Sequence, residues 1–215
     1  KKLLYLCHKI KVMTNFYIYY IIGVILVCLI TFISYRRKLV HLAHQLEADL
    51  NAVLGNVNLQ TYISKKFPDA YIKGSIRSNI EKELEPIHSN IAESMRKMKM
   101  FLVKNEILAS FLEDYANMVP IIKAHNEKQQ QAILMKNKDF FDHVLKYPLD
   151  NQQRRAIISE ENNCLVVSSA GSGKTSSIVG KVEYLTKIKH VNPQEILLIS
   201  YTQKAAQELT DRMNI

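Results

Sequence analysis

Cysteine is scarce in this chain of 215 residues, and the three that it has, Cys7, Cys28 and Cys164, are far apart. None belongs to a CxxC pair, so the sequence offers neither a disulfide framework nor the ligand spacing of a zinc site. His125 and His143 also lack ligand-like pairing, and we expect them at packing or surface positions. No metal cluster is therefore expected.

Acidic residues are missing from residues 1–34. The formal net charge of +9 divides into +4 in residues 1–34, +4 in residues 35–147 and +1 in residues 148–215. The basic character therefore belongs to the N-terminal part and the middle of the chain. It does not indicate a nucleic-acid patch on the C-terminal third.

Charges of either sign are absent from residues 16–33, FYIYYIIGVILVCLITFI. Eighteen uncharged residues in a row, most of them apolar, are long enough to cross a bilayer as a helix, and tyrosines gather at both ends, as expected at membrane interfaces. A cleaved signal peptide would have a shorter run followed by a small-x-small site. Val27 before Cys28 disfavours lipid attachment. We predict a transmembrane helix over residues 16–35; a buried helix of a soluble protein is the alternative.

Positive charges flank this run on both sides. Arg36, Arg37 and Lys38 favour a cytoplasmic C-terminal side, whereas the lysines of residues 1–11 argue for the opposite orientation. Met13 is a candidate initiator. If translation starts there, the opposing lysines are not native and residues 1–15 reduce to a short tail. The expectation is a single-pass protein of the cytoplasmic membrane whose C-terminal part is cytoplasmic.

Strand signals are few in residues 36–147, which we predict to be a helical region. Leucines recur at helical spacing from Leu39 to Leu50, before a stop at Gly55. A second apolar series runs over residues 87–115 until Pro120, and a third over residues 121–144 until Pro148. Such faces indicate helix packing. Imperfect heptads leave a coiled-coil dimer open, and the oligomeric state is not determined.

The C-terminal residues 148–215 have a different character. An apolar run, residues 165–167, enters a small-residue loop, residues 168–173, and Lys174 and Thr175 then open a helical pattern. Strand, glycine loop and helix in this order are typical of a phosphate-binding loop, in which backbone N–H groups surround an anion. Lys174 would reach the β and γ phosphates of a nucleotide, and the Thr175 hydroxyl would hold Mg²⁺.

The predicted nucleotide-binding residues of this loop are Ser168, Ser169, Ala170, Gly171, Ser172, Gly173, Lys174, Thr175 and Ser176. Lys174 and Thr175 are also the candidate catalytic residues. Ser168 occupies the position where the full GxxxxGK[ST] spacing has glycine. A serine-rich turn before an ordinary helix is the competing interpretation.

A second apolar strand is predicted over residues 196–201, after a helix over residues 175–190 and a turn at Asn192 and Pro193. A further helix is expected over residues 204–213. Two strands joined by a crossover helix predict a parallel sheet with its ligand at the carboxyl ends of the strands. The expected fold class is α/β: a transmembrane helix, a mostly helical middle and the start of a P-loop (RecA-like) parallel-sheet domain. Because two strands cannot bury both faces of such a sheet, we expect this domain to be truncated.

Three segments at the right order and spacing carry a family resemblance: LDNQQRRAI (149–157), SSAGSGKT (168–175) and ILLISYTQKAAQEL (196–209). They resemble the Q motif, motif I and motif Ia of superfamily 1A DNA helicases of the UvrD/Rep type. Within that group, His125-Asn126, KDFFDHV (138–144), YPLD (147–150) and Ser176 are most similar to helicase IV and its relatives. The resemblance covers roughly residues 100–215.

The resemblance implies an ATP-dependent DNA helicase with ATP and Mg²⁺ as cofactors and single-stranded DNA as partner. Gln153 matches the glutamine that reads the adenine edge, since an amide offers donor and acceptor together. The DNA-contacting segment of motif Ia corresponds to Tyr201, Thr202, Gln203 and Lys204. Gln203 stands where asparagine or arginine is commoner in the family.

Several family motifs are absent from residues 1–215. No DExx segment and none of the later arginine motifs is present, so we expect this chain alone to lack helicase ATPase activity. The leading hypothesis is a membrane-anchored helicase IV-like protein present as a fragment. The alternative is a membrane-tethered helical scaffold with a non-functional P-loop remnant. A GTPase is disfavoured because no NKxD motif follows the loop.

Overall fold

The computed structural model describes residues 2–169 and 171–213, so Ala170 of the predicted phosphate loop lies outside the described residues. The chain divides into two compact units. Unit 1 comprises Lys1–Tyr62 and Leu84–Ala116, and unit 2 comprises Ile63–Glu83 and Asn117–Ile215. Unit 2 therefore joins part of the predicted helical region to residues 148–215. The domain boundaries at residues 35 and 147 stay a prediction.

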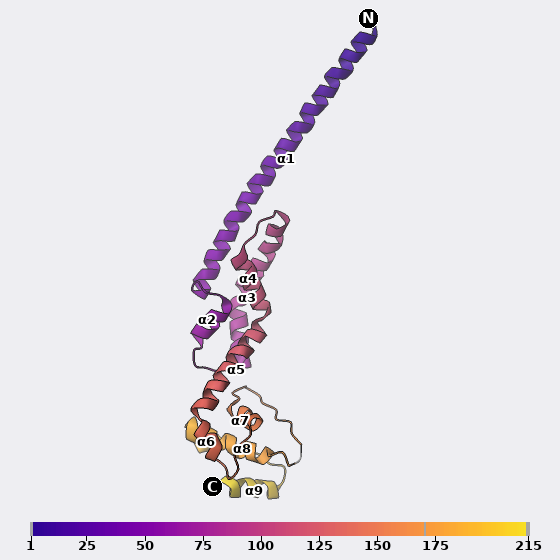
Figure 1. Cartoon of the computed structure of the whole chain (residues 1–215). Coiled ribbons are helices and arrows are strands. Elements are labelled where there is room, and N and C mark those ends of the chain that lie inside the picture. Colours follow the sequence, from indigo (N-terminus) through magenta and orange to yellow (C-terminus); the bar gives the residue numbers. More distant parts are fainter. Residues whose placement is uncertain (1, 170, 214–215) are drawn as a thin grey trace. The chain divides into compact units, whose positions relative to one another are not determined.

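Helices dominate the described residues (Figure 1). In chain order they are α1 (Lys2–Leu54), α2 (Leu59–Lys66), α3 (Gly74–Met100), α4 (Glu106–Ala116), α5 (Met118–Lys136), α6 (Lys138–His143), α7 (Asn151–Ile158), α8 (Lys174–Glu183), the π-helix η1 (Tyr184–Ile188), the 3-10 helix η2 (Pro193–Glu195) and α9 (Gln203–Met213).

Helix α1 is continuous because no proline interrupts it. In its C-terminal half Leu39, Leu46 and Leu50 are buried in unit 1, as the leucine spacing predicted. Gly55, at a φ of 70°, ends the helix, and its N–H donates to Asn51 O at 2.8 Å. Gly55 is thus confirmed as the stop.

Residues 16–33 of α1 are uncharged, mostly apolar and exposed. All side chains of residues 16–38 are exposed, and the most apolar 18-residue window has a mean hydropathy of 2.6. Among the described helices, this one alone is long and apolar enough to cross a membrane.

The second predicted apolar helix is interrupted. Residues 101–105 separate α3 from α4, and the Asn105 side chain caps α4 by accepting from Leu108 N at 2.9 Å. Pro120 does not end a helix as expected, because it lies in the first turn of α5, where a missing N–H costs nothing. The predicted third helix is likewise divided, at Asn137 between α5 and α6.

In unit 2, polar side chains of α5 hold the segment of residues 67–73. Asn126 accepts from Ile72 N at 2.8 Å and donates to Ile72 O at 3.0 Å. His125 Nε2 lies 3.0 Å from Ala70 O, and Gln129 donates to Pro68 O at 2.7 Å. These buried groups satisfy the backbone of a segment that belongs to no helix. His125 is therefore a packing residue, as predicted.

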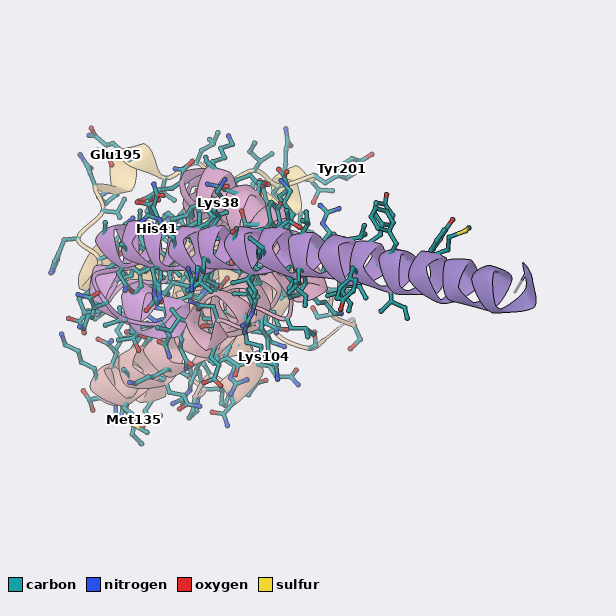
Figure 2. The ribbon with its side chains drawn as sticks, turned by 90° about the horizontal axis from the view of Figure 1, so that it is seen from above. Lys38, His41, Lys104, Met135, Glu195 and Tyr201 are labelled. Atoms are coloured by element: carbon teal, nitrogen blue, oxygen red, sulfur yellow. The ribbon has the colours of Figure 1, made fainter. Side chains whose placement is uncertain are left out.

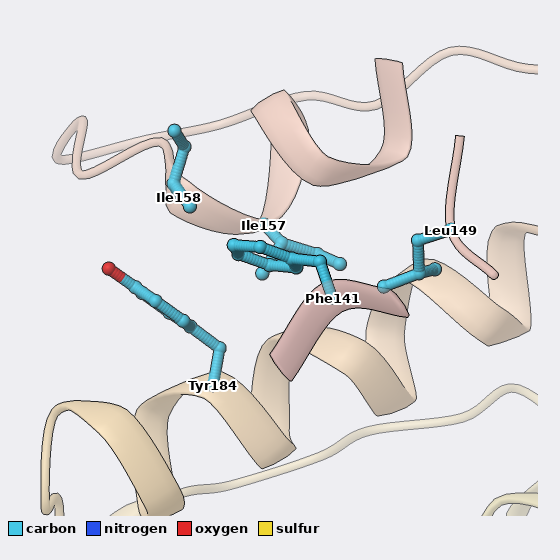
Figure 3. Packing of buried hydrophobic residues seen from close by; sticks show 5 residues of the cluster. All are labelled: Phe141, Leu149, Ile157, Ile158 and Tyr184. Carbon is cyan, nitrogen blue, oxygen red and sulfur yellow. The ribbon is translucent and has the colours of Figure 1, made fainter. Parts of the chain in front are cut away.

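An apolar cluster joins α6, α7 and η1 (Figure 3). Its buried residues are Phe141, Leu149, Ile157, Ile158 and Tyr184. The Phe141 and Tyr184 rings stack with centroids 5.9 Å apart. Gly180 lets α8 approach α7, because a Cβ there would lie 2.7 Å from Ile157 Cδ1.

The predicted parallel sheet is not formed in the described residues. Residues 165–167 and 196–201 belong to no strand, although exposure alternates along both. Leu165 and Leu197 are more than four-fifths exposed, whereas Val166 and Leu198 line a cavity of about 710 Å³ beside α8. The expectation of paired strands was wrong for this structure. The physical reason is that two short strands with one bare apolar face are marginal in water.

Candidate functional site

The predicted phosphate loop leads directly into α8. Gly171 and Gly173 have φ values of 77° and 85°, in the left-handed region that favours glycine, as the predicted sharp turn requires. Gly173 is the N-cap of α8 and has no side chain to cap the first turn. The loop therefore ends at a helix N-terminus whose backbone N–H groups can receive an anion.

Lys174 folds over the loop that precedes it. Its ammonium donates to Ser168 O at 3.0 Å and to Ser169 O at 2.7 Å. Ser172 closes the same turn, since its hydroxyl donates to Ser169 O at 2.8 Å. The positive charge of Lys174 thus lies against an exposed loop, next to a helix N-terminus. Both features favour a negatively charged ligand.

Gln153 lies against this loop and is held at both ends of its amide. Oε1 accepts from Asp150 N at 2.9 Å, while the Asp150 carboxylate accepts from Gln153 N at 2.8 Å, which completes a capping box at the start of α7. Nε2 donates to Ser172 O at 3.3 Å. The approach is close, because a Cβ at Gly173 would lie 2.4 Å from that nitrogen.

Contacts with α6 and with the segment before α7 fix the position of α7. Arg154 donates to Asp142 Oδ1 at 2.6 Å and to Leu149 O at 2.7 Å. Its guanidinium carbon lies 5.9 Å from the centre of the Phe141 ring. Residues of the KDFFDHV and YPLD segments therefore orient the helix that carries Gln153.

Lys181 connects α8 to the end of α7. Its ammonium donates to Ile157 O at 2.5 Å and to Ser159 O at 2.8 Å, and burial lowers its pKa below the usual value. Carbonyls at a helix C-terminus lack intrahelical partners, so a lysine there satisfies them. Together with the close approach at Gly180, this contact sets the spacing of the two helices at the site.

The chain just before residues 165–167 is tied to the start of α3. Glu161 accepts from Tyr71 Oη at 2.9 Å and from Gly74 N at 3.1 Å. Burial and the neighbouring Glu161 raise the pKa of Tyr71 to about 12. A carboxylate at a helix N-terminus is favourable, so Glu161 anchors the segment that leads to the phosphate loop.

The other predicted site residues have the following surroundings. Thr175 and Ser176 are half-buried in the first turn of α8, and Ser176 lines a small cavity with Tyr147 and Arg212. Tyr201, Thr202, Gln203 and Lys204 are all exposed, and Figure 2 shows Tyr201 pointing into solvent. Thr202 caps α9, since its hydroxyl accepts from Ala205 N at 3.2 Å. Among the described residues no group of acidic, histidine and cysteine side chains is placed to hold a metal ion.

The structure therefore brings Gln153 together with Ser172 and Gly173 of the predicted phosphate loop. Sequence reasoning missed two residues that position the site, Asp150 and Lys181. The D-x-x-Q spacing of Asp150 and Gln153 is a capping-box signature that could have been found. Lys181 had no local signal, because its acceptors lie more than twenty residues away.

Comparison with known proteins agrees with these motifs. Residues 149–215 match the UvrD/REP helicase N-terminal domain. DNA helicase IV of Escherichia coli strain K12 is 38% identical over 89 residues, which are 41% of this chain and 13% of that protein. DNA helicase II of the same strain is 35% identical over 65 residues, 30% of this chain and 9% of that protein.

A third relative, the ATP-dependent DNA helicase UvrD1 of Mycobacterium leprae, is 40% identical over 65 residues, 30% of this chain and 8% of that protein. The chain thus spans at most about an eighth of the length of these relatives. No solved structure matches it. Residues 149–215 are a UvrD-type helicase segment of superfamily 1A, as their three motifs predicted.

Proposed function

We propose that the chain is the membrane-anchored, nucleotide-binding part of an ATP-dependent DNA helicase similar to helicase IV, and that residues 168–176 with Gln153 bind Mg·ATP. The observation that carries this proposal is the contact of Gln153 with the phosphate loop. A glutamine amide beside a glycine loop at a helix N-terminus combines a base-reading group with a phosphate-binding group.

The donors present at the loop suit a triphosphate. The N–H groups of the first turn of α8 carry no side-chain cap, and Lys174 supplies the charge. The Thr175 hydroxyl is the oxygen ligand available for Mg²⁺. A bound Mg·ATP would supply the phosphoanhydride bond whose hydrolysis drives translocation in the proposed helicase. The role of this chain is to bind and orient it; residues 1–215 contain no DExx segment to position water.

The proposal also places Gln153 as the adenine-reading residue. In the structure its Nε2 is bonded to Ser172 O, so adenine recognition and loop position share one side chain. A base that binds Gln153 would therefore also affect the hydrogen bond that positions the loop. Membrane attachment through residues 16–35, with the nucleotide site in the cytoplasm, completes the proposed organisation.

Gln153→Glu tests this assignment. A carboxylate still accepts from Asp150 N and preserves the capping box, but it cannot donate to Ser172 O or to a base. We expect unchanged thermal unfolding and a loss of about 10-fold in Mg·ATP affinity, from one lost hydrogen bond and a nearby negative charge. Thermal denaturation measures the unfolding, and titration with fluorescent ATP and GTP analogues measures the affinity for each nucleotide. Equal binding of ATP and GTP by the parent chain would contradict adenine reading, and no binding of either would support the non-functional remnant.

Lys204→Ala tests the proposed DNA segment. Lys204 is exposed in the first turn of α9 and follows the exposed Tyr201 in the sequence by three residues, so it suits a phosphate contact near a stacked base. We expect weaker binding of single-stranded oligonucleotides and a salt slope reduced by roughly one counterion. Lys187→Ala, which removes an exposed lysine paired with Glu183, is the matched control. An unchanged salt slope for Lys204→Ala would reduce Lys204 to a surface lysine.

A further inference from the structure

The turn between α3 and α4 exposes apolar side chains beside the end of the apolar part of α1. The Phe101 ring centroid lies 5.4 Å from that of Phe32 and 4.6 Å from that of Tyr35. In Figure 1 this turn lies next to α1 within unit 1. The flanking side chains of Met100 and Leu102 are 73% and 77% exposed. Two large apolar side chains thus stand uncovered at the level where the uncharged run of residues 16–33 ends.

The backbone holds this turn in a defined shape. Val103 N donates to Met98 O at 3.0 Å and Leu102 N donates to Lys99 O at 3.3 Å, which is the Schellman pattern of a helix C-terminus. Leu102 occupies the left-handed position of this pattern, at a φ of 56°, where glycine is usual. Met98 and Val103 are buried beneath it. A leucine in this left-handed, exposed position is a backbone outlier, and such outliers motivate a functional hypothesis for the side chain.

Positive charge surrounds the exposed pair. Residues 31–46 of α1 and residues 94–105, the end of α3 with the turn, contain no acidic residue. Arg36, Arg37 and Lys38 are exposed just after the apolar run, and Lys99 and Lys104 are exposed on the turn. Figure 2 labels Lys38 and Lys104 among the projecting side chains. Lysines around an apolar tip are the composition expected where a protein meets anionic lipid headgroups.

We propose that residues 99–104 form a second membrane contact, in which Met100 and Leu102 enter the interface of an anionic lipid bilayer beside α1. The inference rests on the proposed membrane span of α1, because that span places Phe32, and with it Phe101, at the bilayer surface. Attachment at two points restricts rotation of unit 1 about the axis of α1. Unit 1 then meets the membrane with one fixed face.

The test places a single tryptophan in the full chain, which has none of its own. Leu102→Trp and, separately, Met100→Trp are reconstituted in phosphatidylglycerol vesicles whose acyl chains carry bromine close to the headgroups. We expect blue-shifted emission and quenching for both. Val53→Trp, also exposed on α1 but about 27 Å further along the helix from Tyr35, should keep water-like emission without quenching.

Ile30→Trp, inside the apolar run, separates the two proposals. Quenching at residue 30 with water-like emission at residues 100 and 102 would overturn the second contact and leave the span intact. Absence of quenching at residue 30 would refute the span itself. A blue shift at residue 102 without quenching would mean that another protein surface, such as a second copy, covers the turn, and would also overturn the proposal.

Leu102→Asn provides an independent check of the same turn. Asparagine tolerates the left-handed conformation, so the fold should be retained while the apolar tip is lost. Combined with Met100→Trp, it should reduce the quenching at residue 100, with circular dichroism unchanged. Quenching that is insensitive to Leu102→Asn would contradict insertion of the Leu102 side chain.

Discussion

Lys174→Ala should remove most of the Mg·ATP affinity of the chain and leave its unfolding unchanged. The ammonium of Lys174 is exposed and bonded to the carbonyls of Ser168 and Ser169, which solvent can satisfy once the lysine is gone. The folded state therefore loses little. A bound triphosphate, in contrast, would lose a charge-assisted partner, worth about 1.5–3 kcal/mol, or roughly 10- to 150-fold in affinity.

The measurement is calorimetric or fluorescence titration with Mg·ATP, alongside chemical denaturation. Lys187→Ala is the matched control, since Lys187 is an exposed lysine that lies beyond α8 and pairs with Glu183. It should bind nucleotide as the parent chain does. If both lysine variants bound equally well, the loop would be a serine-rich turn and not a phosphate site. A large loss of stability in Lys174→Ala would instead assign the residue a structural role.

The helical parts of this structure were the most predictable from the sequence. The leucines from Leu39 to Leu50 repeat at the helical period and all lie on a buried or half-buried face, and Gly55 ends α1 as expected. Local signals of this kind act within one or two turns of chain. The backbone of the predicted phosphate loop was predictable for the same reason, because the left-handed Gly171 and Gly173 and the helix start at Lys174 are local features.

Features that depend on distant residues were not predictable. Asn126 and Gln129 bind the backbone of residues 68–72 across more than fifty residues, and Lys181 meets the end of α7. The break at residues 101–105 contains no proline or glycine that would have predicted it, because Leu102 occupies the left-handed position at which glycine is usual. The predicted sheet was wrong for a different reason. The local apolar pattern of residues 165–167 and 196–201 is present, but strands pair only where neighbouring elements cover both faces of the sheet.

The apolar run of α1 leads to the second large expected effect. Twelve of residues 16–33 are Ile, Leu, Val or Phe, and each contributes about 0.3–0.6 kcal/mol to insertion, whereas one arginine near the centre costs about 2.5–3.5 kcal/mol. Ile25→Arg combined with Leu26→Arg removes two favourable residues and adds a cost of roughly 5–7 kcal/mol. That cost matches or exceeds the total gain of the remaining ten, so insertion should fail.

We therefore expect the parent chain to remain in the membrane pellet after a carbonate wash and the double-arginine variant to be lost from it. Both substituted side chains are about half exposed on α1 and touch no core of unit 1, so a folding defect does not explain the loss. Val40→Arg combined with Val53→Arg adds the same charge at exposed positions of the same helix outside the run, and it should stay in the pellet. If the parent chain were released by carbonate, α1 would not be an anchor. If the double-arginine variant were retained as well as the parent, attachment would depend on the basic and apolar surface of unit 1, and the span would not be what holds the chain.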